Sequence, residues 1–596
     1  MSTTAPPRRP RTATPPPRRT SAQPRPLRLG NPRRRAGFLL LGAIGVLVIF
    51  GVRLLDLQAF RGDALAAAAV DQRTTTVTIL ADRGDILDRN GVPLATSVEA
   101  RNITVDQTLI VDPRETALAI AAVIGGNVDE LAAKLTGDRK FAYVAKDVTP
   151  EDWRAIDDLG LQGIYSERTT KRVYPAGSVG ASVIGFVGAD GVGLGGMEYV
   201  HESVLAGIDG WSTYERASGG AIIPTAERSH QDPVSGNGVQ LTIDRDIQYV
   251  AQRALANEVA ASGAESGSIV VMDPRTGEIL ALAEVPTFDP NDPGAADPAN
   301  LGNRALTEAF EPGSTAKVMT MAAVLEEGGA KPTTMFEVPG TLERAGKEFH
   351  DASEHGTYNW DLTTILSQSS NIGTILAAET IDEAAYYDYL QKFGIGAYSG
   401  LDFPGETAGY LPPRDEWSGT TFPTLVFGQG FSVNAVQMAD VFATIANDGV
   451  RMPVRLLADT SSASSEGIRV VSAHTARSLR EMLEKVVMDG GTAPMAGIPG
   501  YRVGGKTGTA QVINPDCACY DGSTIGSFIG MAPIESPELV IGVTIVKPTV
   551  EQLGGELAGP VFREVMTYAL QARRVAPVTP VSATTSEVPG ATSSDG

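Results

Sequence analysis

An uncharged and apolar run of 17 residues, from residue 36 to residue 52, divides the chain into two parts of opposite charge. The 35 residues before the run contain ten arginines and no acidic residue, whereas the residues after it bring the 596-residue chain to a net charge of −21. In a helix, such a run spans roughly 26 Å, close to the thickness of the hydrocarbon core of a bilayer. The three arginines at residues 33–35 favour a cytoplasmic N-terminus. The run therefore predicts a transmembrane anchor over residues 36–54.

A cleaved signal peptide is the alternative interpretation of the same run. The basic segment before it is longer than a typical signal-peptide n-region, and no small-x-small cleavage site directly follows it. The alanine-rich stretch at residues 64–69 keeps this alternative open. We expect an uncleaved anchor, and hence a single-pass type II protein of the plasma membrane whose remaining residues are extracytoplasmic.

Both ends of the chain are too poor in large apolar residues to bury a core. Residues 1–35 are rich in proline and arginine, and residues 576–596 consist mostly of serine, threonine, proline and alanine. Both compositions predict disorder. The basic segment could bind nucleic acid, but its role as a topology signal explains the charge, and the rest of the chain is strongly acidic. We expect no nucleic-acid partner.

Residues 55–235 predict a first extracytoplasmic domain. Asn90-Gly91 lies between two extended segments and is a strong signal for a β-hairpin. Gly191–Gly196 fits the pattern Gly-x-Gly-x-x-Gly but lacks the strand before it and the helix after it that a dinucleotide site needs. We interpret it as a glycine-rich turn and expect no cofactor.

The two cysteines of the chain, Cys517 and Cys519, are too few for a disulfide scaffold and do not suggest a zinc site. A local disulfide and two thiols both remain open for this pair, and we expect no metal site.

Residues 236–575 predict one mixed α+β domain. Residues 268–283 contain two apolar strands around a turn, and residues 527–546 contain a second such pair. Residues 506–513 are rich in threonine and valine and predict a fifth strand, whereas the pattern around 315–500 is largely helical. Strands at both ends of a domain with helices between them predict a mostly antiparallel five-stranded sheet that is covered by helices.

One stretch of this domain, Glu311–Lys317, combines a candidate nucleophile with a candidate base. Pro312 and Gly313 break the preceding structure, and Ser314 opens a segment with apolar residues at helical spacing. Lys317 lies three residues on, so both side chains share one helix face. A desolvated lysine amine can accept the proton that makes serine a nucleophile. Ser-x-x-Lys alone also occurs by chance on amphipathic helices, so the interpretation needs further residues.

Two later stretches supply those residues. Ser369-Ser370-Asn371 follows an apolar run, and Lys506-Thr507-Gly508-Thr509 follows two glycines. Ser-x-x-Lys, Ser-x-Asn and Lys-Thr-Gly in this order resemble the signature of penicillin-binding proteins and serine β-lactamases. The stretch from Arg83 to Gly91 resembles the Arg-Gly-x-Ile-x-Asp-Arg-Asn-Gly motif of class B penicillin-binding proteins, and the resemblance covers roughly residues 36–575.

The resemblance implies the transpeptidase fold, preceded by a non-catalytic pedestal (dimerisation) domain, and a role for each matching residue. Ser314 would be the nucleophile, and Lys317 would accept its proton. Ser369 would relay the proton to the leaving amine, and Asn371 would hydrogen-bond the substrate amide. Lys506 would be a second cation, which depresses the pKa of Lys317 and attracts the substrate carboxylate. Thr507 and Thr509 would bind that carboxylate, Gly508 would allow close backbone approach, and the N–H groups of Ser314 and Thr509 would form an oxyanion hole. None of the five histidines lies in the three motifs: His201, His230, His350, His355 and His474.

The implied activity is that of a peptidoglycan D,D-transpeptidase, most similar to the division-specific FtsI-like type. Ser314 would attack the penultimate D-Ala carbonyl of a stem peptide, release the last D-Ala, and pass the acyl group to an amine of a neighbouring stem. β-Lactams would acylate the same serine. A secreted β-lactamase would lack the anchor and the pedestal, and a non-catalytic β-lactam sensor would carry several transmembrane segments. An elongation-specific class B transpeptidase remains open.

The resemblance also implies a partner. Peptidoglycan synthesis requires glycan polymerisation, and residues 55–235 resemble a pedestal rather than a glycosyltransferase. We therefore expect a monofunctional enzyme that works with an FtsW-like membrane glycosyltransferase and other divisome proteins. Gly37, Gly42, Ala43 and Gly45 would allow close helix contact in the bilayer, although glycine is frequent in membrane helices in general.

Overall fold

The computed structural model describes residues 32–215, 229–458, 466–514, 519–551 and 553–577. It divides into two compact units, of which unit 1 comprises Met1–Val77 and Ser212–His230, and unit 2 comprises Thr78–Trp211 and Gln231–Gly596. Disorder is expected of residues 1–35 and 576–596, and most of these, residues 1–31 and 578–596, lie outside the described residues. Cys517 also lies outside them. Cys519 takes part in a disulfide bond.

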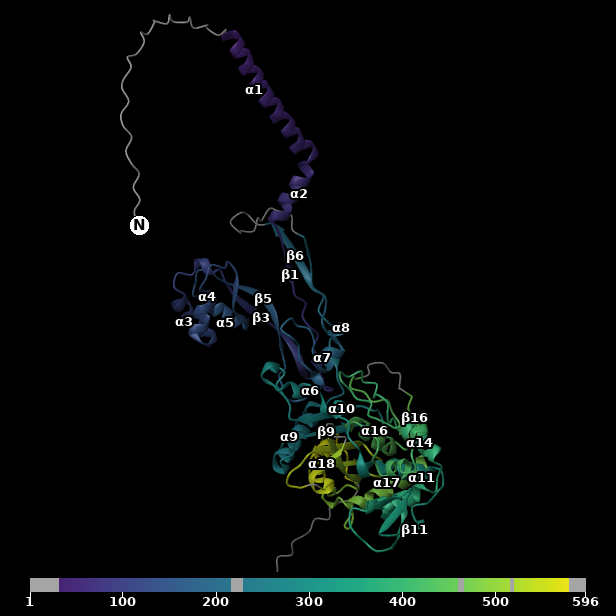
Figure 1. Cartoon of the computed structure of the whole chain (residues 1–596). Helices are drawn as coiled ribbons and strands as arrows, with labels where there is room; N and C mark the ends of the chain where they lie inside the picture. The colour runs from purple at the N-terminus through teal and green to yellow at the C-terminus, as the bar shows by residue number, and fades with distance from the viewer. Residues whose placement is uncertain (1–31, 216–228, 459–465, 515–518, 552, 578–596) are drawn as a thin grey trace, which may run out of the picture. The chain divides into compact units, whose positions relative to one another are not determined.

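Unit 1 contains the apolar N-terminal helix α1, Pro32–Leu55 (Figure 1), which continues into a short π-helical segment, Asp56–Phe60. Within the described residues, Pro32–Phe60 is the one helix long and apolar enough to cross a membrane. The predicted helix over residues 36–54 therefore forms. Residues 32–35 belong to the same helix rather than to the tail that their composition predicted, because a helix nucleated by the apolar run extends through arginines at little cost.

The rest of unit 1 consists of helix α2, Gly62–Arg73, and most of a three-stranded sheet. The strands of this sheet are β1 (Thr74–Ile79), β6 (Gly210–Glu215) and β7 (Ser229–Gln231).

Residues 78–211 and 231–241 of unit 2 form a region built on a second sheet, with the strand order β4-β3-β2-β8 and β5 also paired with β3. The strands are β2 (Ile86–Leu87), β3 (Pro93–Val105), β4 (Ala142–Val148), β5 (Ile164–Val173) and β8 (Val239–Gln240). Asn90-Gly91 makes the turn between β2 and β3, so the predicted hairpin forms, with Ile86 opposite Ala95.

Three helices pack on one end of this sheet and enclose a separate core with residues such as Ile103, Ile120 and Ile156. These helices are α3 (Pro113–Ile124), α4 (Val128–Leu135) and α5 (Pro150–Asp157).

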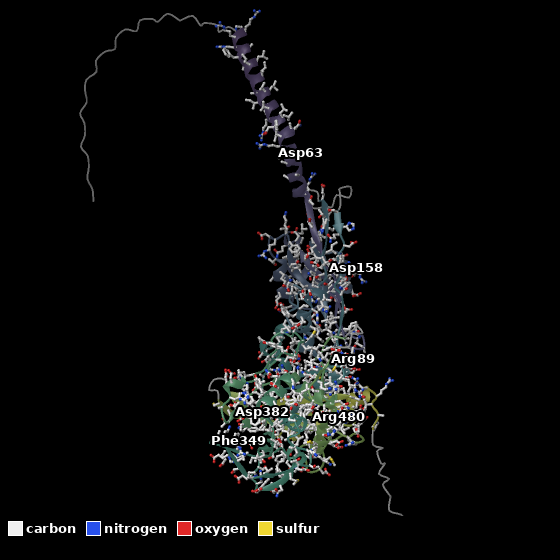
Figure 2. The ribbon with its side chains drawn as sticks, turned by 90° about the vertical axis from the view of Figure 1, so that its right-hand side faces the viewer. Asp63, Arg89, Asp158, Phe349, Asp382 and Arg480 are labelled. Atoms are coloured by element: carbon white, nitrogen blue, oxygen red, sulfur yellow. The ribbon has the colours of Figure 1, made fainter. Side chains whose placement is uncertain are left out.

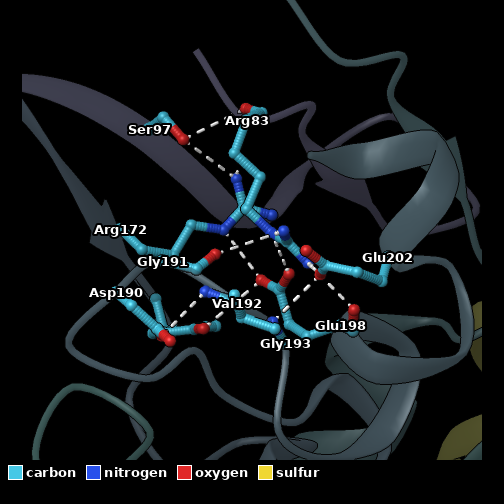
Figure 3. Close-up of polar contacts among 10 residues, drawn as sticks. Arg83, Ser97, Arg172, Asp190, Gly191, Val192, Gly193, Glu198 and Glu202 are labelled. Carbon is cyan, nitrogen blue, oxygen red and sulfur yellow. Dashed lines mark hydrogen bonds and ion pairs between the residues drawn. The ribbon is translucent and has the colours of Figure 1, made fainter. Parts of the chain in front are cut away.

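A buried cluster of charges fixes the other end of the same region (Figure 3). Glu198, in α7 (Gly196–Val200), is fully buried and accepts from Arg83 Nε at 2.6 Å and from Arg172 Nε at 2.7 Å. Arg83 also pairs with Glu202, at 2.7 Å, at the start of α8 (Glu202–Leu205). Gly193 lies so close to α7 that a Cβ atom on Gly193 would meet the carbonyl oxygen of Glu198 at 2.2 Å. Residues 191–195 of the Gly-x-Gly-x-x-Gly segment thus form a loop beside the ion-pair cluster, and Gly196 begins α7, a five-residue helix that the sequence did not predict.

The main sheet of unit 2 has five antiparallel strands in the order β10-β9-β19-β18-β17, which confirms the predicted strands and their antiparallel pairing. β17 is an edge strand of this sheet. The strands are β9 (Ser266–Met272), β10 (Ile279–Val285), β17 (Gly504–Asn514), β18 (Cys519–Ala532) and β19 (Leu539–Val546).

Alternate residues of these strands enter two different cores. Ile269, Val271 and Val543 pack with α9 (Arg245–Ser262) and α18 (Gly554–Ala572) on one face. Val270, Met272, Ile529 and Val540 pack on the other face with helices that include α11 and α16. The helices on this second side are α10 (Arg304–Thr307), α11 (Lys317–Glu326), α12 (Leu362–Ser367), α13 (Asn371–Ala378), α14 (Glu383–Lys392), α15 (Thr421–Leu425), α16 (Ala435–Ala446) and α17 (Ala473–Val487).

α16 is the central helix of this second layer, and all of its residues are buried. Its carboxyl end is held by Arg480 of α17, which is labelled in Figure 2. The Nη1 atom of Arg480 donates to the carbonyl oxygen of Ile445 at 3.0 Å and to Asp448 at 2.9 Å. A cation at this end satisfies orphan carbonyls and opposes the helix dipole.

Three small two-stranded antiparallel sheets interrupt the region that the sequence predicted to be helical. They pair β11 (Met335–Val338) with β14 (Tyr358–Asp361), β12 (Thr341–Arg344) with β13 (Lys347–His350), and β15 (Val450–Arg451) with β16 (Ile468–Arg469). The loop between β13 and β14 borders the candidate site.

Candidate active site

Ser314 lies on a 3₁₀ turn, Gly313–Ala316, which continues directly into α11. The sequence predicted that this serine opens an α-helix, whereas the α-helix begins at Lys317. In a 3₁₀ turn, side chains three residues apart lie nearly above one another. Lys317 Nζ accordingly lies 3.1 Å from Ser314 Oγ. Gly313 has a φ of 54° and donates its N–H to the carbonyl oxygen of Gly428, which anchors the turn.

Ser369 and Ser370 lie between α12 and α13, Asn371 is the first residue of α13, and the segment faces the Lys317 amine. Lys317 Nζ lies 2.5 Å from the carbonyl oxygen of Ser369 and 2.7 Å from Asn371 Oδ1. Ser370 caps α13, since its hydroxyl accepts from the N–H of Gly373 at 2.8 Å. Ser369 has a left-handed backbone, with a φ of 61°, which costs an L-residue about 1–2 kcal/mol. The segment is thus strained and held by its neighbours.

Lys506 approaches the same segment from β17. Its Nζ lies 2.9 Å from Ser369 Oγ and 3.2 Å from Thr507 Oγ1. Lys317 Nζ lies 3.3 Å from the same Ser369 hydroxyl. Ser369 Oγ therefore lies between two lysine amines, which is the geometry that a proton relay requires.

Burial changes the protonation of both lysines. Both side chains are fully buried. Burial lowers the pKa of Lys317 to about 7, and the carboxylate of Asp351 partly opposes this shift. Burial also lowers the pKa of Lys506 well below its usual value, and the neighbouring Lys317 contributes in the same direction. An amine with a pKa near neutrality can accept a proton at physiological pH.

A cavity of about 630 Å³ opens onto these groups. Ser314, Ser369, Asn371, Thr507 and Thr509 line it, whereas the two buried amines lie behind this lining. The cavity presents a hydroxyl nucleophile, a side-chain amide and two threonine hydroxyls to a ligand. The arrangement suits acyl transfer, in which a nucleophile, a base and polar groups that hold the substrate must converge.

Comparisons with known proteins match two separate regions of the chain to known families. Residues 267–567 match the family model of the penicillin-binding protein transpeptidase domain, and residues 78–241 match that of the penicillin-binding protein dimerisation domain. The penicillin-binding protein PbpB of Mycolicibacterium smegmatis is 39% identical over 92% of this chain and 91% of its own length. This chain belongs to the class B penicillin-binding proteins. It is a serine-type peptidoglycan D,D-transpeptidase.

Further relatives of this penicillin-binding protein support the assignment. The peptidoglycan D,D-transpeptidase FtsI of Escherichia coli is 32% identical over 90% of this chain and 92% of its own length. The crystal structure of penicillin-binding protein 3 from Mycobacterium tuberculosis in complex with aztreonam has a TM-score of 0.67 and 35% sequence identity, and the match covers 85% of this chain and 99% of that chain. The predicted transpeptidase fold is thereby confirmed.

Gly508 has a structural place in this penicillin-binding protein that its motif did not indicate. It does not line the cavity but lies behind it, where a Cβ atom would meet Ser527 Oγ at 2.4 Å, Thr315 Cγ2 at 3.0 Å and the Pro312 carbonyl oxygen at 3.2 Å. The missing side chain lets β17 lie directly against the turn that carries Ser314.

Two residues near the site of this penicillin-binding protein escaped the sequence analysis. Asp351 accepts from the Ser370 hydroxyl at 2.6 Å, and His355 Nε2 lies 3.0 Å from the same carboxylate. Both residues lie in the loop between β13 and β14, and neither occupies a position of the three motifs. An acidic residue and a histidine four residues apart, shortly before the apolar run that leads to Ser369, were the only available signal.

Glu311 connects the nucleophile segment to two further elements. One carboxylate oxygen accepts from the N–H of Gly430 at 2.8 Å, and the other accepts from the Tyr520 hydroxyl of β18 at 3.0 Å. Burial, together with the charge of Glu311, raises the pKa of Tyr520 to about 12, so the tyrosine remains a donor at neutral pH.

Proposed function

We propose that this enzyme cross-links peptidoglycan stem peptides through an acyl-enzyme on Ser314. The observation that carries the proposal is the 3.1 Å contact between Ser314 Oγ and a lysine amine whose pKa is lowered to about 7. A neutral Lys317 amine takes the proton of Ser314 as its oxygen attacks the penultimate D-Ala carbonyl carbon. A backbone oxyanion hole formed by the N–H groups of Ser314 and Thr509 stabilises the resulting tetrahedral oxyanion.

Collapse of this intermediate completes the first half-reaction. The C–N bond to the last D-Ala breaks, and its amine receives a proton from Lys317 through the Ser369 hydroxyl, which contacts both lysine amines. Asn371 orients the substrate amide, and Lys506, Thr507 and Thr509 hold the terminal carboxylate. An amine of a second stem peptide then attacks the Ser314 ester and releases the free hydroxyl. A β-lactam follows the first half-reaction only, because its leaving amine stays tethered to the acyl group.

The direct test replaces the nucleophile. We expect fluorescent penicillin to label the full-length protein covalently and Ser314→Ala to abolish the label, because no other group would form the ester. The exposed Ser203, in α8 and far from the three motifs in sequence, provides the matched control Ser203→Ala. A folded Ser314→Ala protein that is labelled as strongly as the wild type would refute the proposed nucleophile.

We further propose a septal role, with the protein anchored by α1 in the plasma membrane in type II orientation and paired with an FtsW-like glycosyltransferase. Support comes from the similarity to FtsI of E. coli over most of both chains and from the apolar helix preceded by arginines. An elongation-specific role is the second candidate, which the same anchor and transpeptidase domain would serve.

Localisation separates the two roles. A fluorescent fusion is expected at the division septum, and the anchored protein is expected to co-purify with the FtsW-like polymerase. Replacement of residues 36–52 with an unrelated apolar helix of equal length should weaken co-purification while penicillin labelling persists, if the anchor makes the contact. Uniform sidewall fluorescence would instead indicate an elongation enzyme.

A further inference from the structure

His355 and Asp351 form a buried pair beside the second motif. Each side chain is 8% exposed, and His355 Nε2 lies 3.0 Å from Asp351 Oδ2. The other ring nitrogen, Nδ1, lies 2.6 Å from the carbonyl oxygen of Gly356. Both neighbours are hydrogen-bond acceptors, and a neutral imidazole donates from only one nitrogen. Each ring nitrogen therefore faces one acceptor, and Nε2 is the ring atom that reaches the Asp351 carboxylate.

The ring is also held by aromatic contacts. It stacks on Tyr358, with ring centroids 5.1 Å apart, and lies 5.7 Å from the ring of Trp360. Both aromatic residues belong to β14. The small sheet of β11 and β14, which the sequence did not predict, therefore fixes the position of the imidazole. His355 therefore has two separable features, the packing of its ring and the hydrogen bonds of its ring nitrogens. The experiment must separate the effects of these two features.

Among the residues that the structure describes, the other hydrogen bonds of the Asp351 carboxylate come from the second motif and from the helix that this motif begins. Oδ2 accepts from the Ser370 hydroxyl at 2.6 Å, and Oδ1 accepts from the N–H of Ile372 at 2.9 Å. Ile372 lies in the first turn of α13, where N–H groups lack partners within the helix and a negative charge is favourable. Asp351 thus caps this helix from outside the chain segment that forms it.

The capped segment carries the groups that face the two lysines. Ser369 has a left-handed backbone, which an L-residue keeps only where its surroundings enforce it. Its carbonyl oxygen contacts Lys317 Nζ, and its hydroxyl contacts Lys506 Nζ. Asn371 Nδ2 donates to the carbonyl oxygen of His350 at 3.0 Å, which turns Oδ1 toward Lys317. The loop that contains Asp351 and His355 therefore supports the strained segment along its length.

We propose that His355 is a positioning residue for transpeptidation: its Nε2–H group orients Asp351, and Asp351 holds the Ser369–Asn371 segment against the amines of Lys317 and Lys506. Asp351 contributes a second effect, because its charge raises the pKa of Lys317 and so opposes the effect of burial. The contact of Asp351 with the segment is direct, whereas His355 acts only through Asp351.

The experiment compares two replacements of His355 in the full-length protein, with the second-order rate of acylation by fluorescent penicillin as the readout. His355→Phe retains a ring that can stack on Tyr358 but removes both ring nitrogens. His355→Gln removes the ring but retains an N–H for Asp351. A positioning role predicts a loss of about tenfold to a hundredfold for His355→Phe and a smaller loss for His355→Gln, since a hydrogen bond to a charged group is at stake. A packing role predicts the reverse order and would overturn the proposal.

A double-mutant cycle tests whether His355 acts through Asp351. Asp351→Asn with His355→Phe should be no slower than Asp351→Asn alone, whereas independent, multiplicative losses would contradict the proposal. If the phenylalanine variant does not fold, the same cycle with His355→Gln serves, and melting curves report folding in each case. His474→Phe, at an exposed position on α17, is the matched control and should keep the wild-type rate.

This inference rests on the proposed acylation of Ser314, and the two can fail separately. A folded Ser314→Ala protein that is still labelled by fluorescent penicillin would refute the proposed function. Labelling that depends on Ser314, together with a wild-type rate in His355→Phe, would refute the role of His355 alone.

Discussion

Lys317 is subject to two opposing demands. As a base it must be neutral when Ser314 attacks, and its complete burial favours the neutral form. Its contacts with the Ser369 carbonyl oxygen and with Asn371 Oδ1 require donated protons, and the Asp351 carboxylate favours the charged form. The balance places the pKa of Lys317 at about 7, against an ordinary value of 10.5. The residue can therefore both accept and return a proton at neutral pH.

This balance predicts the pH dependence of acylation. The rate of penicillin acylation should rise with pH through about 7 and level off above it, because only the neutral Lys317 amine accepts the proton of Ser314. Well below that pH, the rate should fall about tenfold per pH unit. Stopped-flow labelling between pH 5.5 and 8.5 measures it, with circular dichroism at each pH to verify folding. A flat profile over this range would exclude Lys317 as the base.

The same shift affects stability, and its sign follows from proton counting. Between pH 7 and 10.5 the unfolded chain binds a proton at this lysine that the folded chain excludes. The unfolded state therefore gains relative stability as the pH falls through this window, and Lys317 makes its largest unfavourable contribution at and below neutrality. The residue that performs the proton transfer is thus one that weakens the fold around it.

At the scale of elements, the site depends on the contact between β17 and the 3₁₀ turn. Gly508 makes this contact possible, because a Cβ atom there would overlap Ser527 Oγ at 2.4 Å and approach the turn at Thr315 and Pro312. Overpacking of a dense region typically costs about 1–3 kcal/mol. We expect Gly508→Ala to shift β17 away from Ser314.

Gly508→Ala should accordingly lower the acylation rate at least tenfold and lower the melting temperature. The double variant Gly508→Ala with Ser527→Ala should recover part of the rate, because it removes the closest overlapping atom. Gly302→Ala, where a Cβ atom would meet nothing within 4 Å, is the matched control and should leave both quantities unchanged. Equal effects of the two glycine replacements would argue against a specific contact at β17.

Much of this element structure could be predicted from the sequence. The five strands of the main sheet have long apolar patterns, and the three motifs have fixed spacing within themselves, so both are local signals. The remainder depends on tertiary contacts. The loop that carries Asp351 and His355 has no local pattern, because its role arises from contact with Ser370. The left-handed backbone of Ser369 is likewise enforced by its neighbours, and the 3₁₀ turn at Ser314 depends on the hydrogen bond from Gly313 to Gly428.

At the scale of the whole of unit 2, the two family regions share one core. Met197 and Leu94 of the N-terminal region belong to the same contiguous cluster as Val270 and Met272 of the main sheet. The helices α3–α5 enclose a different core, which includes Ile120. Damage to the shared core should therefore reach the transpeptidase domain, whereas damage to the separate core should not.

Two matched core replacements test this coupling. Met197→Ala and Ile120→Ala both truncate a buried side chain, at 1% and 0% exposure, and each should cost about 2–5 kcal/mol locally. Heating followed by penicillin labelling should show earlier inactivation for Met197→Ala and a profile near that of the wild type for Ile120→Ala. Limited proteolysis should show the opposite preference, with early cleavage near α3–α5 in Ile120→Ala. Identical inactivation profiles for the two variants would indicate that unit 2 unfolds as a single cooperative body.

The position of β17 at the edge of its sheet has a consequence for how the enzyme can escape an inhibitor. An edge strand presents main-chain N–H and C=O groups along its free side, and Thr507 and Thr509 of this strand border the cavity. Mutation replaces side chains but retains these main-chain groups. A compound that forms hydrogen bonds with the strand itself therefore contacts a part of the enzyme that substitution cannot delete. Resistance to such a compound would have to arise indirectly, through neighbours such as Gly508 that set where the strand lies.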